Sequence, residues 1–416
     1  MYTTIFFIII AFIVGEFAIE QYLDYRNRKA SKSPIPQEAE GIYNEEEYAK
    51  QQSYFAENNK FGAISDTFSL IVTLLMFFCF GFKFVDDIIR SFELNSIWNS
   101  VLFFSALFLG LSLIGIPFSW YKTFVIEEKY GFNKMTTGVF VSDVIKNLLL
   151  STILSGIVIA ALSAIYSWLG ENYWIIGWIV MSGISVLMMM FYASIIVPMF
   201  NKLTPLPEGE LRNAIEDFCK KVDFKLDNLF VIDGSKRSSK ANAFFSGLGS
   251  KKKICLYDTL IDSMTTEEIV AVLAHEIGHY KKKHTLVMLV FSVMNTGLIL
   301  YLSSIALGSP ESGNLALSQA LGSDNPSFHF SMVVFMLLFT PVSTLIGFFI
   351  NKISRMNEYQ ADDFAREHGY GDALISALRK LTGKSLSNLT PDSLYVAYHF
   401  NHPTLVERVR AIKSHK

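Results

Sequence analysis

The chain has 416 residues, of which 51% are hydrophobic and only 18% are charged, with 36 Phe and a mean hydropathy of +0.34. Soluble domains average about 25% charged residues, so this composition is typical of a lipid-facing chain and excludes disordered, collagen-like and disulfide-rich secreted proteins. The formal net charge of −2 excludes a basic nucleic-acid surface, and three scattered cysteines without a CxxC motif exclude a metal knuckle or disulfide framework.

Seven mostly apolar stretches are long enough to cross a bilayer as helices, which takes about 20 residues. They are Thr3–Leu23, Ser65–Phe84, Ser96–Trp120, Ile145–Leu169, Tyr173–Phe200, Thr285–Leu307 and His329–Ile350. The first has no basic start and no small-residue cleavage site, so the sequence predicts a span there rather than a cleavable signal peptide.

The distribution of Lys and Arg between the loops predicts how the spans are oriented. These residues are frequent after the first and third spans and absent from the loops 170–172 and 308–328. Because positive charge marks the cytoplasmic side, we expect the N-terminus outside and the C-terminus in the cytoplasm. The expected division is 1–200 (five spans and their loops), 201–284 (cytoplasmic core), 285–350 (two spans) and 351–416 (the rest of the core).

The two polar stretches predict a small α/β unit. Helical spacing indicates helices at Pro205–Asp223, Glu267–Lys283, Asn357–Glu367 and Gly371–Thr382. An apolar run at Leu229–Asp233 predicts a strand, and Ala241–Ser246 with Lys253–Asp258 predicts a β-hairpin around Gly247, Gly249 and Ser250. Thr265 and Glu268 have the spacing of a capping box at the start of the Glu267–Lys283 helix.

An HExxH motif on that helix indicates metal chemistry. His275 and His279 are four residues apart, so both imidazoles project from one helix face, and both can bind one Zn²⁺. Glu276 can then act on a water molecule as a general base. A chance motif on an ordinary helix is the alternative, but the apolar flanks and the well-capped helix favour the metal.

A catalytic zinc site usually has a third protein ligand, and the HExxH helix does not supply one. Position 285, where a metzincin has its third His, is Thr285, and His284 is expected to face away, about 140° around the helix. Glu358 is the best candidate ligand, with Asp362 one turn further to orient a ligand His. A solvated acidic helix face is the alternative.

Several motifs together identify a family. They are Phe124–Lys134, Phe200–Gly209, Asn242–Phe244, the HExxH at 275–279, Glu358 with Asp362, and His402–Thr404. In these motifs and their order the chain resembles the type I CAAX prenyl proteases, which are integral-membrane zinc endopeptidases. Glu127 and Glu128 lie in the first of these motifs, but the sequence alone gives them no physical role.

The resemblance implies a mainly α, polytopic membrane protein. Its seven transmembrane helices would form a water-filled chamber, with a gluzincin-like zinc metalloprotease core and a small β-hairpin on the cytoplasmic side. It maps one Zn²⁺ per chain to His275, His279 and Glu358, the catalytic base to Glu276, and the acidic position after the ligand Glu to Asp362. The implied substrate is a C-terminal CaaX peptide, prenylated or unmodified, and the membrane is the bacterial plasma membrane or that of the ER.

Other residues are expected to assist. His402 is predicted to donate to the developing oxyanion, the alternative being a helix-terminal His, and Arg408 to hold a substrate carboxylate or a local acid, the alternative being a surface Arg. The segment with Asn242, Ala243 and Phe244 is predicted to pair with an extended substrate by strand addition, unless it is an ordinary hairpin strand.

Two other functions remain open from the residues. One is a membrane quality-control protease with the same site and unmodified substrates, which would typically have fewer spans. The other is a zinc-binding transporter, but transporters usually place ionisable residues within their spans, and Glu16 is the main such residue here.

Overall fold

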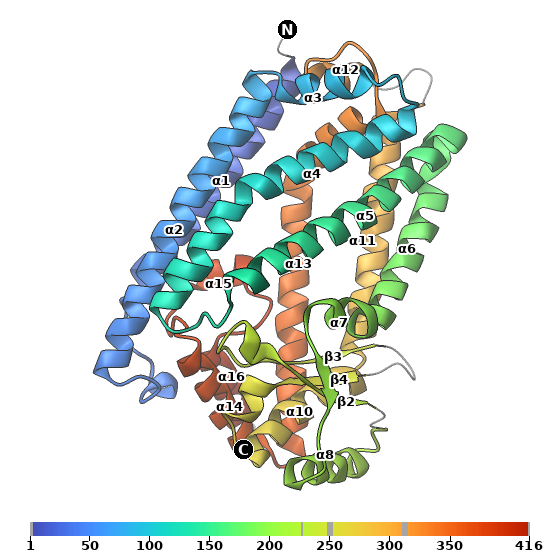
Figure 1. The fold of residues 1–416 in the computed structure, drawn as a ribbon. Helices are drawn as coiled ribbons and strands as arrows, with labels where there is room; N and C mark the ends of the chain where they lie inside the picture. The colour runs from blue at the N-terminus through green and yellow to red at the C-terminus, as the bar shows by residue number, and fades with distance from the viewer. Residues whose placement is uncertain (1–2, 226–227, 248–252, 310–314, 415–416) are drawn as a thin grey trace.

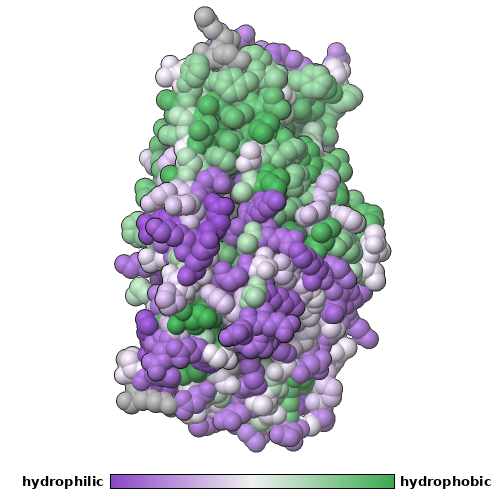
Figure 2. Space-filling model, turned by 90° about the vertical axis from the view of Figure 1, so that its left-hand side faces the viewer, coloured by the Kyte–Doolittle hydropathy of each residue, from purple (hydrophilic) through white to green (hydrophobic). Residues whose placement is uncertain are grey.

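The computed structural model describes residues 3–225, 228–247, 253–309 and 315–414. Figure 1 shows two parts set end to end, with long helices and the N-terminus at one end and a compact unit with the C-terminus at the other. Figure 2 shows the same division on the surface, hydrophobic over the helical part and hydrophilic over the compact unit. This polarity is what a chain half embedded in lipid requires.

The predicted spans are found as long helices. They are α1 (Thr4–Ala30), α2 (Glu45–Phe78), α4 (Ser96–Tyr121), α5 (Thr137–Leu169), α6 (Tyr173–Phe191), α11 (His284–Leu307) and α13 (Phe328–Glu367). Six helical stretches of the described chain are long and apolar enough to cross a membrane, because α5 and α6 form one stretch, Thr137–Phe200, around the short turn η3 (Gly170–Asn172). These two antiparallel helices account for the fourth and fifth predicted spans.

Two predicted boundaries in this part are wrong. The second span ends at Phe78, since Phe80 has a left-handed backbone (φ 54°) and α3 (Gly81–Arg90) starts there in a new direction. The helix expected to begin at Asn357 is the last part of α13, which continues unbroken from the seventh span. The membrane helix therefore carries Glu358 and Asp362 directly.

The membrane helices bury little of their surface against one another. Between 6% and 17% of the residues in the most apolar stretch of each spanning helix are buried. Helices packed as a solid bundle would bury one face each, so this low value fits helices arranged as a wall with two accessible sides. Short elements join or end the spans: η1 (Gln37–Ala39), the π-helical η2 (Lys122–Glu127) and η4 (Tyr192–Ile196), α7 (Val197–Phe200) and α12 (Leu315–Ala320).

The compact unit is built on a four-stranded sheet of order β1-β2-β4-β3. Its strands are β1 (Leu203–Pro205), β2 (Leu229–Ile232), β3 (Ala243–Ser246) and β4 (Lys253–Tyr257). The predicted strand at 229–233 is confirmed, and so are the hairpin strands, since β3 pairs antiparallel with β4 through Phe244 and Cys255. Gly249 and Ser250 of the expected turn lie outside the described residues.

Further helices complete the compact unit. They are α8 (Glu210–Lys221), α9 (Asp258–Ile261), α10 (Thr266–Lys281), α14 (Gly371–Lys384), α15 (Ser393–His399) and α16 (Leu405–Ser414), with the turn η5 (Gly234–Lys236). Of these, α10 is in contact with β3 and α9 with β4. The helix expected at Pro205–Asp223 starts only at Glu210, because Leu203–Pro205 pairs with β2 as strand β1. The capping box is confirmed, since Thr265 and Glu268 exchange both hydrogen bonds at the start of α10.

Candidate metal centre

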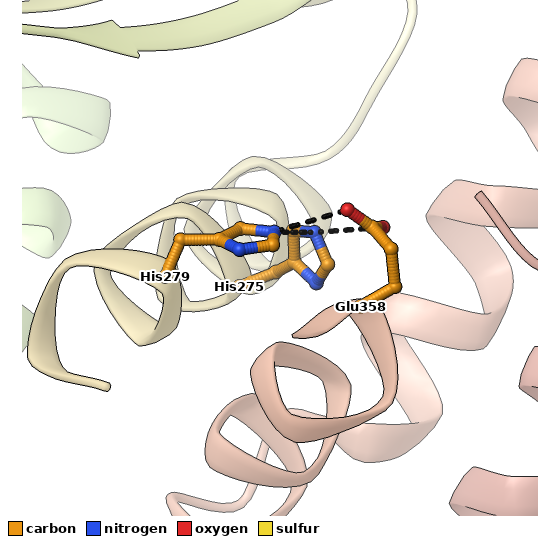
Figure 3. A group of neighbouring side chains, drawn as sticks. All are labelled: His275, His279 and Glu358. Atoms are coloured by element: carbon orange, nitrogen blue, oxygen red, sulfur yellow. Dashed lines mark hydrogen bonds and ion pairs between the residues drawn. The ribbon is translucent and has the colours of Figure 1, made fainter. Parts of the chain in front are cut away.

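Three potential metal ligands converge where α10 meets α13. Figure 3 shows His275 and His279 projecting from one face of α10 and Glu358 of α13 pointing toward them. The two Nε2 atoms are 3.2 Å apart. Glu358 Oε1 lies 3.2 Å from His279 Nε2, and Glu358 Oε2 lies 3.5 Å from His275 Nε2. The four-residue spacing of the HExxH motif thus places both imidazoles on one face of α10, as predicted.

This donor set fits a zinc ion. Ligands bonded at about 2.0–2.1 Å in a tetrahedron are roughly 3.3–3.4 Å from one another, close to the three separations found here. Two imidazoles and one carboxylate leave a fourth position open, as catalytic rather than structural zinc sites do. Charge agrees as well, because the buried carboxylates of Glu358 and Asp362 face a single buried guanidinium, that of Arg408.

A glycine in the motif allows the two helices to come this close. A Cβ atom added to Gly278 would lie only 3.1 Å from Ala361 Cα and from Phe364 Cβ of α13. Ala361 lies one turn beyond Glu358 and next to Asp362, so the close contact at Gly278 brings both carboxylates up to the imidazoles. The apolar residues Ile269, Val270 and Leu273 fix α10 in the core on its other faces.

Asp362 and Arg408 hold His275 in place. A carboxylate only accepts hydrogen bonds, so Nδ1 of His275 donates to Asp362 Oδ1 at 2.8 Å, and Nε2 on the other side of the ring faces the site. Arg408 binds both oxygens of Asp362, at 2.8 and 2.6 Å. Burial lowers the pKa of His275, but its hydrogen bonds to Asp362 and Glu358 outweigh this and raise that pKa to about 9. The pocket therefore favours positive charge.

The prediction that His284 faces away from the site is wrong, because its ring contacts His279. Lys283 has a left-handed backbone (φ 60°), which ends α10 and turns the chain into α11, and His284 Nδ1 lies 3.0 Å from His279 Nδ1. Gln360 Oε1 accepts from His284 Nε2 at 3.0 Å, so Nδ1 of His284 is free to accept from His279. That arrangement leaves the Nε2 lone pair of His279 facing the site. The sequence around Lys283 carries no signal for this left-handed residue, since it is not a glycine.

The remaining predicted residues lie around the donors. Among the described residues, none hydrogen-bonds the half-buried carboxylate of Glu276, which leaves it available to a water molecule. His402, in the turn between α15 and α16, places Nδ1 2.8 Å from Glu358 Oε2, and its side chain is 58% exposed. Arg408 is buried against Asp362, so of its two expected roles the geometry favours holding a local acid.

The predicted substrate strand forms an edge of the sheet beside the motif helix. Among the described strands β3 pairs with β4 alone, and it contacts α10. Exposed Asn242 precedes it and accepts from the Ala243 amide through its side chain at 2.9 Å. The Phe244 ring packs edge-on toward Tyr257. Within the described residues, β3 is thus an edge strand whose second edge pairs with no other strand.

Two family profiles together span almost the whole chain. The profile for the N-terminal part of CAAX prenyl proteases, described as five membrane helices, matches residues 24–202, and that for peptidase family M48 matches residues 205–416. The profile boundary falls between the membrane helices α1–α7 and the compact unit.

Individual relatives are similar over their full length. CAAX prenyl protease 1 of Saccharomyces cerevisiae is 36% identical, with 97% of this chain and 94% of the relative covered. The human CAAX prenyl protease 1 homolog is 31% identical over 95% of this chain and 93% of its own. The crystal structure of S. mikatae Ste24p superposes with a TM-score of 0.92 at 33% identity, covering 99% of this chain and all of that one.

Proposed function

Because the chain belongs to the CAAX prenyl proteases of peptidase family M48, we propose that it is a zinc-dependent membrane endopeptidase that removes the last three residues from prenylated CaaX C-termini. The observation that carries this proposal is the convergence of His275, His279 and Glu358 (Figure 3), with Glu276 on the same helix as the two imidazoles. Membership in the family indicates a membrane metallopeptidase. We further infer that the metal is zinc, that these three residues bind it and that the substrate is prenylated.

In this mechanism each residue has a defined task. His275, His279 and Glu358 hold the metal, and Asp362 and His284 keep the two imidazoles oriented through their Nδ1 atoms. When bound, zinc supplies Lewis-acid polarisation of a peptide carbonyl and a lower pKa for a coordinated water. Glu276 takes the proton of the attacking water on its carboxylate and passes it to the nitrogen of the leaving amine.

β3 would hold the peptide. An extended substrate that adds to its free edge gains backbone hydrogen bonds, while Asn242, Ala243 and Phe244 mark where it would pair. Pairing next to α10 would bring the scissile carbonyl to the metal and Glu276.

The metal dependence and the prenyl requirement can be tested together. Purified protein in detergent is given a farnesylated CaaX peptide or the same peptide with an unmodified Cys, with and without a zinc chelator. We expect faster cleavage of the farnesylated peptide and loss of all cleavage with the chelator. Equal rates on both peptides would favour the quality-control alternative, and chelator-resistant cleavage would refute the metal mechanism.

His402 is expected to matter mainly in the transition state. Its ring lies on Glu358 and is more than half exposed, so the free edge can face bound substrate. Losing one oxyanion donor costs about 10²–10³-fold in kcat, and kcat/KM falls equally while KM changes little. We therefore expect His402→Ala to retain metal and lose that factor of kcat. Loss of metal would instead make His402 a ligand, and kcat within a few-fold of wild type would remove it from the mechanism.

The proposed orientation places the metal centre in the cytoplasm, at the plasma membrane of a bacterium or at the ER. Its basis is the Lys and Arg bias of the loops. Single cysteines at exposed Asn325 and Ser414, in a background without native cysteines, test it with an impermeant reagent on intact cells or sealed ER vesicles. In intact bacterial cells we expect labelling of Asn325→Cys but not of Ser414→Cys, and in ER vesicles the opposite. The inverted pattern would place the active site on the other side.

A further inference from the structure

The Glu127 and Glu128 motif, to which the sequence alone gives no role, contacts the segment that leads into β3. Glu127 Oε2 lies 2.9 Å from Lys240 Nζ, and Glu127 Oε1 accepts from the Tyr54 hydroxyl at 2.6 Å. Lys240 also donates to the Tyr54 hydroxyl at 3.1 Å and lies 4.4 Å from the centre of the Phe132 ring. One lysine thus has an ionic, a hydroxyl and an aromatic partner.

These contacts are stronger than those of a typical surface ion pair. The side chains of Glu127 and Lys240 are 17% and 35% exposed, so solvent screens the pair only in part. Partial desolvation also strengthens the cation–π contact with Phe132. Glu127 further comes at the end of the π-helical turn η2, a local form that is often found at functional positions.

Glu128 supports the same junction through the side chain of Asn133. Its carboxylate accepts from Asn133 Nδ2 at 2.9 Å, and Asn133 forms a β-bridge with Ser238. Around this bridge the loop and the compact unit exchange two backbone hydrogen bonds, from Ser239 to Phe132 and from Lys134 to Arg237, each 3.1 Å long. The two glutamates therefore attach the loop after α4 to residues 237–240.

The attached segment determines where β3 begins. Residues 239–242 have no regular structure of their own, so their path depends on side-chain contacts. Lys240 is three residues before Ala243, which is within about 10 Å of extended chain. On the other side, Thr259 donates to the Lys240 carbonyl at 3.0 Å and Tyr257 to the Asn242 carbonyl at 3.1 Å. The segment is thus held between the membrane loop and β4.

We propose that Glu127, Lys240 and Tyr54 form a positioning clamp that fixes the free edge of β3 relative to the membrane helices, so that substrate pairs with it in one place. The clamp rests on the proposed function of β3 as the substrate strand. Its residues hold the strand and do not touch the reacting atoms. Because strand pairing contributes equally to ground-state and transition-state binding, loosening the clamp should raise KM and leave kcat almost unchanged.

The test uses Lys240→Met and Glu127→Gln in the full-length protein, with kinetics on the farnesylated CaaX peptide. We expect KM to rise by roughly 5- to 20-fold, kcat to stay within about two-fold and bound metal to be unchanged. The matched control is Lys129→Met. Lys129 lies in the same loop as Glu127, but its 2.7 Å ion pair is with Glu57 of α2 and does not involve residues 237–242. The exchanged pair Glu127→Lys with Lys240→Glu should lower KM most of the way back to the wild-type value.

A second measurement needs no substrate. Hydrogen exchange of the amides of residues 243–246 should become about ten-fold faster in Lys240→Met and stay unchanged in Lys129→Met. If wild-type protein does not cleave the peptide, the proposed function fails. The hydrogen-exchange rates of residues 243–246 then still show whether Lys240 holds β3 in place. Wild-type KM in both variants of an active enzyme, or wild-type exchange in Lys240→Met, would overturn it.

Discussion

Replacing Glu276 by Gln is expected to leave a folded, metal-loaded protein that has lost nearly all turnover. The amide has the size of the carboxylate but cannot take a proton from the attacking water, and a positioned general base contributes about 10²–10⁴-fold. Because no described residue hydrogen-bonds the Glu276 carboxylate, the substitution breaks no hydrogen bond within the described residues. Metal analysis and steady-state kinetics on the same preparation measure both effects.

The matched control is Glu267→Gln, the same chemical change at an exposed position of the same helix. It should keep wild-type kcat. If Glu276→Gln turns over at a rate near that of wild type, Glu276 is not the base.

Removing a proposed ligand should have the largest effect on metal binding. Structural zinc sites have apparent binding free energies of about 10–16 kcal/mol, shared among four ligands, so losing one ligand here should weaken affinity by roughly 10²–10³-fold. We expect this of Glu358→Ala and His279→Ala, together with loss of activity. Asp362→Ala, which removes only the partner of His275 Nδ1, should weaken affinity by about 10–100-fold.

Asp363 provides the control for this series. It lies next to Asp362 on α13, is 38% exposed and pairs with Arg366 rather than with the site. Asp363→Ala should therefore bind zinc as tightly as wild type in a competition titration. Should Glu358→Ala also do so, the third ligand lies elsewhere.

What could be predicted from sequence was governed by local periodicity. The apolar stretches gave the membrane helices because length and composition decide membrane crossing. The HExxH spacing gave the paired imidazoles because both lie on one helix. Glu358 and Asp362 were found as an i, i+4 acidic pair, although their place on an uninterrupted α13 was not.

What could not be predicted depends on contacts between distant segments or on single backbone angles. The left-handed conformation of Lys283 turns His284 toward His279, against the expectation from a continuous helix. Glu127 and Lys240 are 113 residues apart, and nothing in the local pattern of either indicates the other. Strand β1 exists only because it pairs with β2.

The central claim is tested most directly by identifying the products of a single incubation. Zinc-loaded protein is mixed with a farnesylated CaaX peptide, and the products are determined by mass spectrometry. The account predicts two products, the released tripeptide and a peptide ending in farnesyl-cysteine, and neither of them with the chelator or with Glu276→Gln. An uncleaved peptide, cleavage at other bonds, or the same products from Glu276→Gln would contradict it.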